Sequence, residues 1–110
     1  MMTAIVFFIE DKVKQRFYSL EHGTREEQHL FSVIQATIGK IKENPFSGFQ
    51  VPKKQIPKIY LKKYGIDNLW KIDLSASWRL VYSVASNDEG IITLIIEWFD
   101  HQEYERRFRY

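Results

Sequence analysis

The sequence predicts an α+β fold in which an antiparallel helix pair covers one face of a small, mostly antiparallel sheet. In the first half of the chain, apolar residues recur every three or four positions, which is typical of amphipathic helices. In the last third, three short runs rich in β-branched and aromatic residues are separated by polar turns, which is typical of strands. A chain of 110 residues with 45% hydrophobic content is expected to form one domain, residues 1–110.

One strand and two helices are expected in the first half. The short apolar run Ala4–Ile9 predicts a buried strand. Asp11 is predicted to cap the first helix and Gly23 to end it. The segment Thr24–Glu27 matches a capping box and opens a second helix, which Asn44-Pro45 ends. The tight turn between the helices predicts an antiparallel pair, and packing against the sheet is the expected role of their apolar stripes.

The segment 45–68 holds all three prolines of the chain and is predicted to be a long connection, with a short helix around Lys58–Tyr64 that Gly65 ends. Within residues 51–63 there are five lysines and no carboxylate: Lys53, Lys54, Lys58, Lys62 and Lys63. A cationic segment on a chain of net charge +2 indicates either a directed anionic partner or a solvated loop.

Three strands are expected next, over residues 69–74, 78–84 and 91–99. On the middle strand, alternation places Trp78 and every second residue after it on one face, and Arg79 on the other. If the helices cover the tryptophan side, Arg79 projects from an uncovered face. The polar segment Ser86–Gly90 ends in glycine, as expected of a hairpin loop.

Several classes of function lack support in the sequence. There are no cysteines, and the three histidines lack the spacing of a metal site, so neither a metal nor a cofactor is expected. Nucleotide-binding glycine motifs and the Gly-x-Ser-x-Gly motif are missing. The longest apolar run is too short to span a membrane or to act as a signal peptide. We therefore expect a cytoplasmic protein with no membrane partner.

A cationic group of residues remains and fits RNA cleavage without a metal. Such a reaction needs a group that removes the 2′-hydroxyl proton, a group that protonates the leaving 5′-oxygen, and cations that stabilise the charged phosphorane. Arg79 is a candidate phosphate clamp, and His101 a candidate general acid or base. Tyr104 is a candidate for stacking on a base or donating a proton, while Lys53, Lys54 and Lys58 are candidates for neutralising backbone phosphates.

Each candidate has a structural alternative. Arg79 is also suited to a cross-strand pair with Asp73. His101 follows Asp100 where a C-terminal helix is expected to begin, so packing at the helix entry is an alternative to catalysis. The last group of basic residues either adds to the cationic group at the C-terminal exit of the sheet or is a solvated tail: Arg106, Arg107 and Arg109.

Three segments together carry a family resemblance: Asn68-Leu-Trp-Lys-Ile-Asp-Leu, Trp78-Arg-Leu-Val-Tyr and Asp100-His-Gln-Glu-Tyr-Glu-Arg-Arg-Phe. They resemble the RelE/ParE superfamily of type II toxins, with RelE-like proteins of archaea and some bacteria as the nearest type. The resemblance implies the order strand–helix–helix–strand–strand–strand, followed by a short helix, along nearly the whole chain.

The resemblance also implies roles for single residues. Arg79 would contact the scissile phosphate, and Lys53 and Lys54, with Lys58 nearby, would hold mRNA. The position after the last strand and the tyrosine that follows it would fall on His101 and Tyr104, while Arg106 and Arg107 would add to RNA binding.

The function implied is that of a toxin that cleaves mRNA at the ribosome and is neutralised by a cognate antitoxin protein. Because this fold hosts several activities, two alternatives stay open. One is a non-catalytic ParE-like toxin that inhibits gyrase, and the other is a catalytically diverged nucleic-acid-binding protein.

Overall fold

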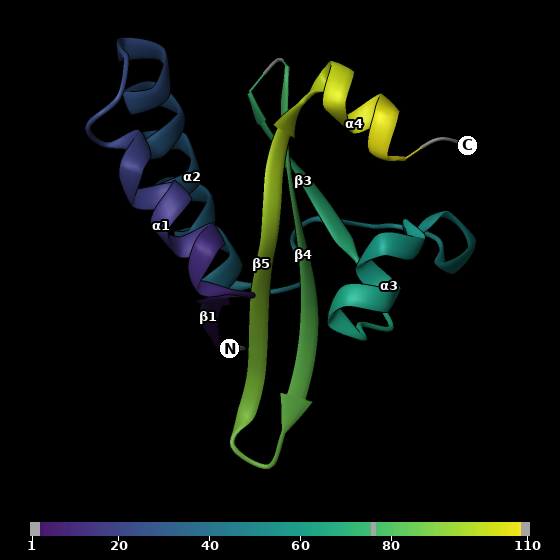
Figure 1. The fold of residues 1–110 in the computed structure, drawn as a ribbon. Helices are drawn as coiled ribbons and strands as arrows, with labels where there is room; N and C mark the ends of the chain where they lie inside the picture. The colour runs from purple at the N-terminus through teal and green to yellow at the C-terminus, as the bar shows by residue number, and fades with distance from the viewer. Residues whose placement is uncertain (1–2, 76, 109–110) are drawn as a thin grey trace.

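The computed structural model describes residues 3–75 and 77–108, which form four α-helices and a five-stranded mixed sheet (Figure 1). The strands are β1 (Ala4–Phe8), β2 (Phe49–Gln50), β3 (Trp70–Ser75), β4 (Trp78–Asn87) and β5 (Gly90–Asp100). The helices are α1 (Asp11–Leu20), α2 (Arg25–Glu43), α3 (Lys58–Tyr64) and α4 (His101–Arg107), with a short 3₁₀ helix at Lys53–Gln55. The predicted α+β class is confirmed.

The strand order in the sheet is β1-β5-β4-β3-β2. Strand β1 runs parallel to β5, and every other neighbouring pair is antiparallel. The sheet is therefore mostly antiparallel, as predicted. Strands β4 and β5 are joined by the expected tight hairpin, in which the Asn87 side-chain oxygen accepts hydrogen bonds from the backbone N–H groups of Glu89 and Gly90.

The helix pair forms as the sequence predicts, except at the ends of α1. Thr24 and Glu27 make both hydrogen bonds of a capping box at the start of α2, and Asn44 caps its other end. In α1, however, Glu10 occupies the N-cap position and Asp11 lies in the first turn. Gly23 is not in the left-handed conformation of a C′ residue; α1 ends at Leu20 with Glu21 in the right-handed helical region as its C-cap.

The first hydrophobic core lies between this helix pair and the sheet. Phe17 of α1 stacks on Phe31 of α2 at 4.6 Å, and both pack with Trp98 of β5 and the buried faces of β3 and β4. The tryptophan side of the sheet is thus covered by helices, as expected.

The opposite face of the sheet was expected to be uncovered, and this expectation is wrong. Helices α3 and α4 lie on that side (Figure 1), where they enclose a second core with the sheet. Val81 of β4 and Ile96 and Phe99 of β5 provide its sheet side, and Tyr60 of α3 and Tyr104 of α4 cover them. The fold therefore has three layers, and Arg79 lies at the edge of a covered face.

A β-bulge in β5 sets which residues reach each core. Val81 pairs with Glu97 and Tyr82 pairs with Ile95, so Ile96 is an extra residue in β5. Because of this residue, Ile95 and Trp98 both belong to the helix-pair core although they are three positions apart. The bulge also turns Glu97 toward α3, where it meets Tyr60.

The connection 45–68 is more structured than its sequence suggests. It contains the two-residue edge strand β2, the 3₁₀ helix and α3, which ends as predicted at Gly65 with φ +64°. Across residues 3–75 and 77–108, no helix is both long enough and apolar enough to cross a membrane.

Candidate functional site

Strands β3 and β4 present a row of polar side chains on the face that α3 and α4 cover. Trp70 and Ile72 point into the helix-pair core, so Lys71 and Asp73 point to the opposite side. Asp73 is paired with Arg79 across β3 and β4, and Phe49 of β2 is paired with Lys71 across β2 and β3. These four side chains therefore lie together on one face at the β2–β3 edge of the sheet.

Helix α4 adds a tyrosine to this group. The Asp100 side chain caps α4 by accepting from the backbone N–H of Glu103 at 2.9 Å. Tyr104 then lies against Phe99, with ring centroids 5.9 Å apart, and stacks on Phe108 at 4.6 Å. The ring is almost completely buried, yet its hydroxyl reaches the polar row at Lys71.

Lys71 is the centre of the group. Its Nζ donates a hydrogen bond to the Tyr104 hydroxyl at 2.8 Å and lies 5.0 Å from the centroid of the Tyr104 ring. On its other side, the same ammonium lies 5.4 Å from the Phe49 ring. The guanidinium carbon of Arg79 is 5.7 Å from the Tyr104 ring. Two cations and a phenol thus converge within a few ångströms.

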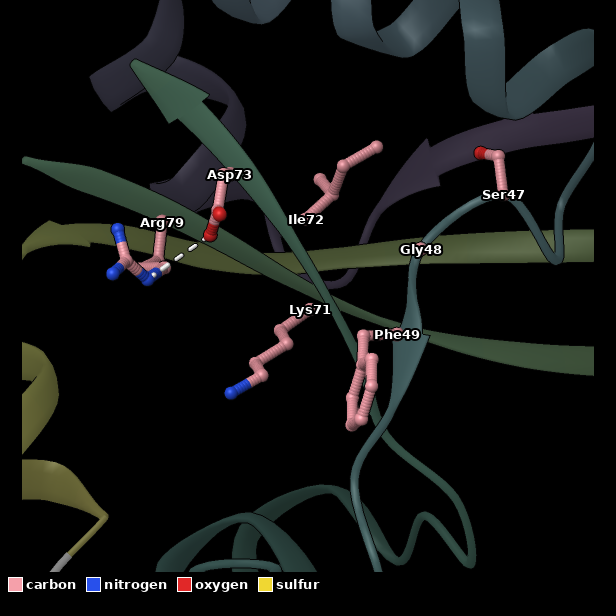
Figure 2. A pocket seen from close by; sticks show the side chains of 7 residues that line it. All are labelled: Ser47, Gly48, Phe49, Lys71, Ile72, Asp73 and Arg79. Atoms are coloured by element: carbon pink, nitrogen blue, oxygen red, sulfur yellow. Dashed lines mark ion pairs between the residues drawn. The ribbon is translucent and has the colours of Figure 1, made fainter. Parts of the chain in front are cut away.

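Asp73 partly neutralises this positive charge. Its Oδ1 is 3.0 Å from Nε of Arg79, and this ion pair is drawn in Figure 2. The Asp73 side chain is 73% exposed, whereas that of Arg79 is 20% exposed. Arg79 therefore has the cross-strand partner that the sequence allowed as its structural role, and it also lies beside the other cationic group.

A hollow of about 430 Å³ opens over these residues. Figure 2 shows Arg79, Lys71 and Phe49 around this space, with the Lys71 ammonium extending between the other two side chains. The remaining lining residues are Ser47, Gly48, Ile72 and Asp73. The volume lies in the range of small-molecule sites and is large enough for a nucleotide.

Tyr82 holds the wall of the hollow in place from inside the first core. Its hydroxyl donates to the carbonyl of Pro45 and accepts from the N–H of Gly48, each at 3.0 Å. Burial raises the pKa of Tyr82 above its usual value, so the phenol stays protonated as this donor requires. A side chain at position 48 would come within 2.7 Å of both the Lys71 carbonyl oxygen and the Tyr82 hydroxyl. Glycine is therefore needed for this close approach.

Of the three residues proposed for catalysis, the structure brings Arg79 and Tyr104 together and leaves His101 apart. His101 is the first residue of α4, and its side chain is 60% exposed. Its Nε2 lies 3.4 Å from Glu105, one turn along the helix, and His101 is not among the residues that line the hollow.

Most of the proposed RNA-binding residues line a second hollow, between the segment 54–59 and α4. Its volume is about 660 Å³, and its cations are Lys54, Lys58, Arg106 and Arg107. Arg106 is paired with Glu103 at 2.7 Å, and Arg107 lies 3.7 Å from Glu97. Lys53 is exposed on the 3₁₀ helix and lines neither hollow. Neither hollow is lined by Arg79 together with His101 or with any of these lysines.

Sequence reasoning missed Lys71, although a signal for it was present. The same alternation that places Trp70 and Ile72 in the core places Lys71 beside Asp73 on the face of Arg79. What the sequence does not reveal is that Tyr104, 33 positions later, packs onto this lysine.

Among the described residues 3–75 and 77–108, no three His, Asp or Glu side chains gather where they could hold a metal ion. In comparisons with protein-family models, with curated proteins and with solved structures, no match to the chain is found. The function is therefore argued from the chemistry of the hollow and from the motifs in the sequence.

Proposed function

We propose that the chain is a RelE-like toxin of a type II toxin–antitoxin system that cleaves mRNA at the ribosome, in the cytoplasm. The observation that carries this proposal is the meeting of Lys71 and Arg79 at one open hollow, with the Tyr104 hydroxyl hydrogen-bonded to Lys71 behind it. The sequence motifs around Arg79 and Tyr104 support the family, and an α+β fold with a helix pair on a mostly antiparallel sheet is compatible with it.

The reaction proposed is transesterification within the RNA. The 2′-hydroxyl oxygen attacks the neighbouring phosphorus, the bond to the 5′-oxygen breaks, and a 2′,3′-cyclic phosphate and a 5′-hydroxyl are formed. One proton leaves the 2′-hydroxyl and one reaches the 5′-oxygen, so the step needs no other reactant. Arg79 is suited to bind the phosphate oxygens, because its guanidinium remains charged and can donate to two of them.

We assign proton transfer to Lys71 and Tyr104 instead of His101. The Lys71 ammonium donates to the Tyr104 hydroxyl, and the Arg79 guanidinium lies beside the Tyr104 ring. In this proposal the ammonium gives a proton to the leaving 5′-oxygen and takes one back from the Tyr104 hydroxyl, which receives the proton of the 2′-hydroxyl. His101 is exposed and faces Glu105. In this proposal, the second hollow, with Lys54, Lys58, Arg106 and Arg107, binds backbone phosphates of the RNA that leaves the first hollow.

The Asp73–Arg79 ion pair favours a second candidate, a diverged RelE-fold protein that binds nucleic acid without cleaving it. A carboxylate 3.0 Å from Nε of Arg79 competes with a substrate phosphate for the guanidinium. A ParE-like inhibitor of gyrase is the other alternative. Both predict that the protein acts without producing cyclic phosphate ends.

The deciding experiment is a cleavage assay on ribosome-bound mRNA with analysis of the RNA ends. We expect 2′,3′-cyclic phosphates, and their yield should not change when the enzyme is first treated with EDTA and then freed of the chelator before the ribosomes are added. Arg79→Ala is expected to slow cleavage on the order of 10²-fold or more through lost stabilisation of the phosphorane. Arg25→Ala, which changes an exposed arginine on α2, is the matched control and should cleave normally. Toxicity with intact mRNA and inhibited gyrase would contradict the proposal.

A further inference from the structure

Phe49 is exposed to an unusual degree for an aromatic side chain. It is 66% exposed, and no other large apolar side chain in residues 3–75 and 77–108 is as exposed. Its neighbour Phe46, by contrast, packs on Trp70 with centroids 5.4 Å apart. Covering the Phe49 ring would remove a large apolar area from water, which is favourable. Because the ring lies exposed at the rim of the hollow, a ligand that covers it would gain this free energy on binding.

The backbone that carries Phe49 is also held in place. It belongs to β2, which pairs with Trp70 and Lys71 of β3, and the preceding residue Gly48 is fixed by the Tyr82 hydroxyl. A side chain on a strand loses less freedom when it binds a ligand than one on a free loop does. The ring is therefore a preorganised flat surface at the entrance of the hollow.

The groups that follow Phe49 along the hollow match the parts of a nucleotide in order. The ring comes first, then the Lys71 ammonium at 5.4 Å from it, and then Arg79 on the far side (Figure 2). An aromatic ring binds the face of a nucleobase, whereas ammonium and guanidinium groups bind phosphate oxygens. A protein partner would instead need a contiguous apolar patch, and Phe49 has a cation and polar backbone beside it.

We propose that Phe49 stacks on the nucleobase of the nucleotide whose phosphate is bound by Lys71 and Arg79. This inference rests on the proposed function and adds to it a base-binding subsite within single-stranded RNA. Stacking depends on the flat face of the base and less on its identity, so Phe49 fixes the position of the strand and leaves its sequence largely unread.

A double-mutant cycle between the protein and the RNA tests the subsite. The probes are octamers of 2′-O-methyl RNA, which cannot be cleaved because the attacking oxygen is blocked, either intact or lacking the base at one position. Binding of each octamer to the full-length protein is measured by fluorescence anisotropy. At one position, loss of the base is expected to weaken binding to the wild type about 5- to 100-fold, the range seen for single base–aromatic stacks.

Phe49→Ala should bind the intact octamer as weakly as the wild type binds the octamer that lacks this base, and it should lose little more when the base is removed. Phe49→Tyr should restore most of the coupling because it restores the ring. Phe7→Ala is the matched control, since Phe7 is 51% exposed but lies on β1 at the other edge of the sheet. When the base is removed, Phe7→Ala should lose as much affinity as the wild type does.

The possible failures are distinguishable. One failure is that Arg79→Ala weakens binding while Phe49→Ala still loses as much affinity as the wild type when a base is removed, at every position. In that case the subsite is wrong and the proposed function stands. If Phe7→Ala abolishes the coupling as well, the effect is not specific to Phe49 and the subsite is also wrong. If the wild type binds none of the octamers, the base-binding subsite is overturned, while the proposed function is decided separately by the cleavage assay on ribosome-bound mRNA.

Discussion

Asp73 determines how available Arg79 is to a substrate. The carboxylate is largely exposed and holds Arg79 at 3.0 Å, so it repels phosphate oxygens and occupies one edge of the guanidinium. Exposed ion pairs contribute roughly 0–1 kcal/mol, so releasing one has a small cost in stability.

Asp73→Asn is therefore expected to increase cleavage, by up to about fivefold, and to leave the melting temperature nearly unchanged. The measurement is the cleavage rate at low substrate, with Asp88→Asn in the β4–β5 turn as control. A fall in rate would mean that Asp73 serves to orient Arg79.

Lys71 and Tyr104 are expected to act as one unit because they share a hydrogen bond of 2.8 Å. Lys71→Met and Tyr104→Phe should each reduce the cleavage rate about 10²- to 10⁴-fold, the range of general acid–base catalysis. The double variant should cost about as much as either single variant, as groups that act together do. Single-turnover cleavage rates check this, with Lys40→Met on α2 as control. If the fold loss in the double variant equals the product of the two single losses, the two residues act independently and the prediction is wrong.

At this scale the sequence predicted the site only in part. Arg79 could be placed on the correct face because strand alternation is a local property. His101 was a reasonable candidate by chemistry, but its contact with Glu105 follows from the i,i+4 spacing of the two residues in the expected C-terminal helix and could have been foreseen. Tyr104 could be named, yet its contact with Lys71 depends on how α4 packs, which the residues near Tyr104 do not determine.

Among the elements, the wall 45–48 is the part that a single methyl group should disturb. Gly48→Ala places a Cβ 2.7 Å from two oxygens, one of them on the backbone of β3. We expect a loss of roughly 1–3 kcal/mol in the free energy of unfolding, together with weaker cleavage. Gly39→Ala is the matched control: it lies on α2 with nothing within 4 Å of an added Cβ, so it should stabilise the protein by up to about 1 kcal/mol. Urea denaturation of both variants checks the contrast.

Helix α3 is held to the sheet by a buried polar contact that should weaken in alkali. Tyr60 donates a hydrogen bond to Glu97, and burial, with a further contribution from the Glu97 charge, raises the pKa of Tyr60 above its ordinary value of 10.0. The unfolded chain then releases this proton at a lower pH than the folded chain does. Stability is thus fully present below pH 10 and falls as the pH rises above it, by up to about 1.4 kcal/mol per pH unit for one proton.

Tyr60→Phe should therefore flatten the loss of stability above pH 10, although it lowers stability at neutral pH by leaving Glu97 without its donor. Denaturant unfolding at several pH values from 8 to 11 measures the slope. Tyr18→Phe, a change on the exposed side of α1, is the control. An unchanged slope in Tyr60→Phe would show that the phenol does not contribute.

The elements were predicted best where a local signal defines them. Thr24 and Glu27 fix the start of α2 through their own hydrogen bonds, and Gly65 ends α3 through its left-handed backbone. Strand β2 has only two residues and exists because β3 lies beside it, so no local pattern announces it. The bulge at Ile96 likewise depends on its pairing with β4.

At the scale of the whole molecule, the second core was not foreseen. Val81 and Ile96 gave an apolar side to the sheet opposite the tryptophans, but the partners that cover it come from two short helices separated by three strands. Long-range packing of this kind leaves little trace in periodicity. It also leaves the hollow at the β2–β3 edge as an open part of that face.

The proposed toxin function requires an antitoxin, which we expect to cover this hollow or to displace the segment 101–110. An acidic segment that folds on binding would match the cations of both hollows, so association should be fast and slow down with added salt. Co-expression with the neighbouring reading frame should restore growth, and the two proteins should purify together. Equal growth with and without the neighbour, and no bound partner, would count against a toxin.

The pairing of β1 with β5 has a consequence for the order in which the chain is made. Within the described residues 3–75 and 77–108, residues 4–8 pair in the sheet with β5 alone, in register with residues 91–95. At about 5–20 residues per second, a nascent chain waits roughly 4 to 17 seconds before this pairing is possible. Tyr104 is synthesised later still. A growing chain therefore lacks both the complete sheet and the Tyr104 hydroxyl until residue 104 has been added. Under the proposed function, the nascent chain would for that time be unable to attack the mRNA of the ribosome that is translating it.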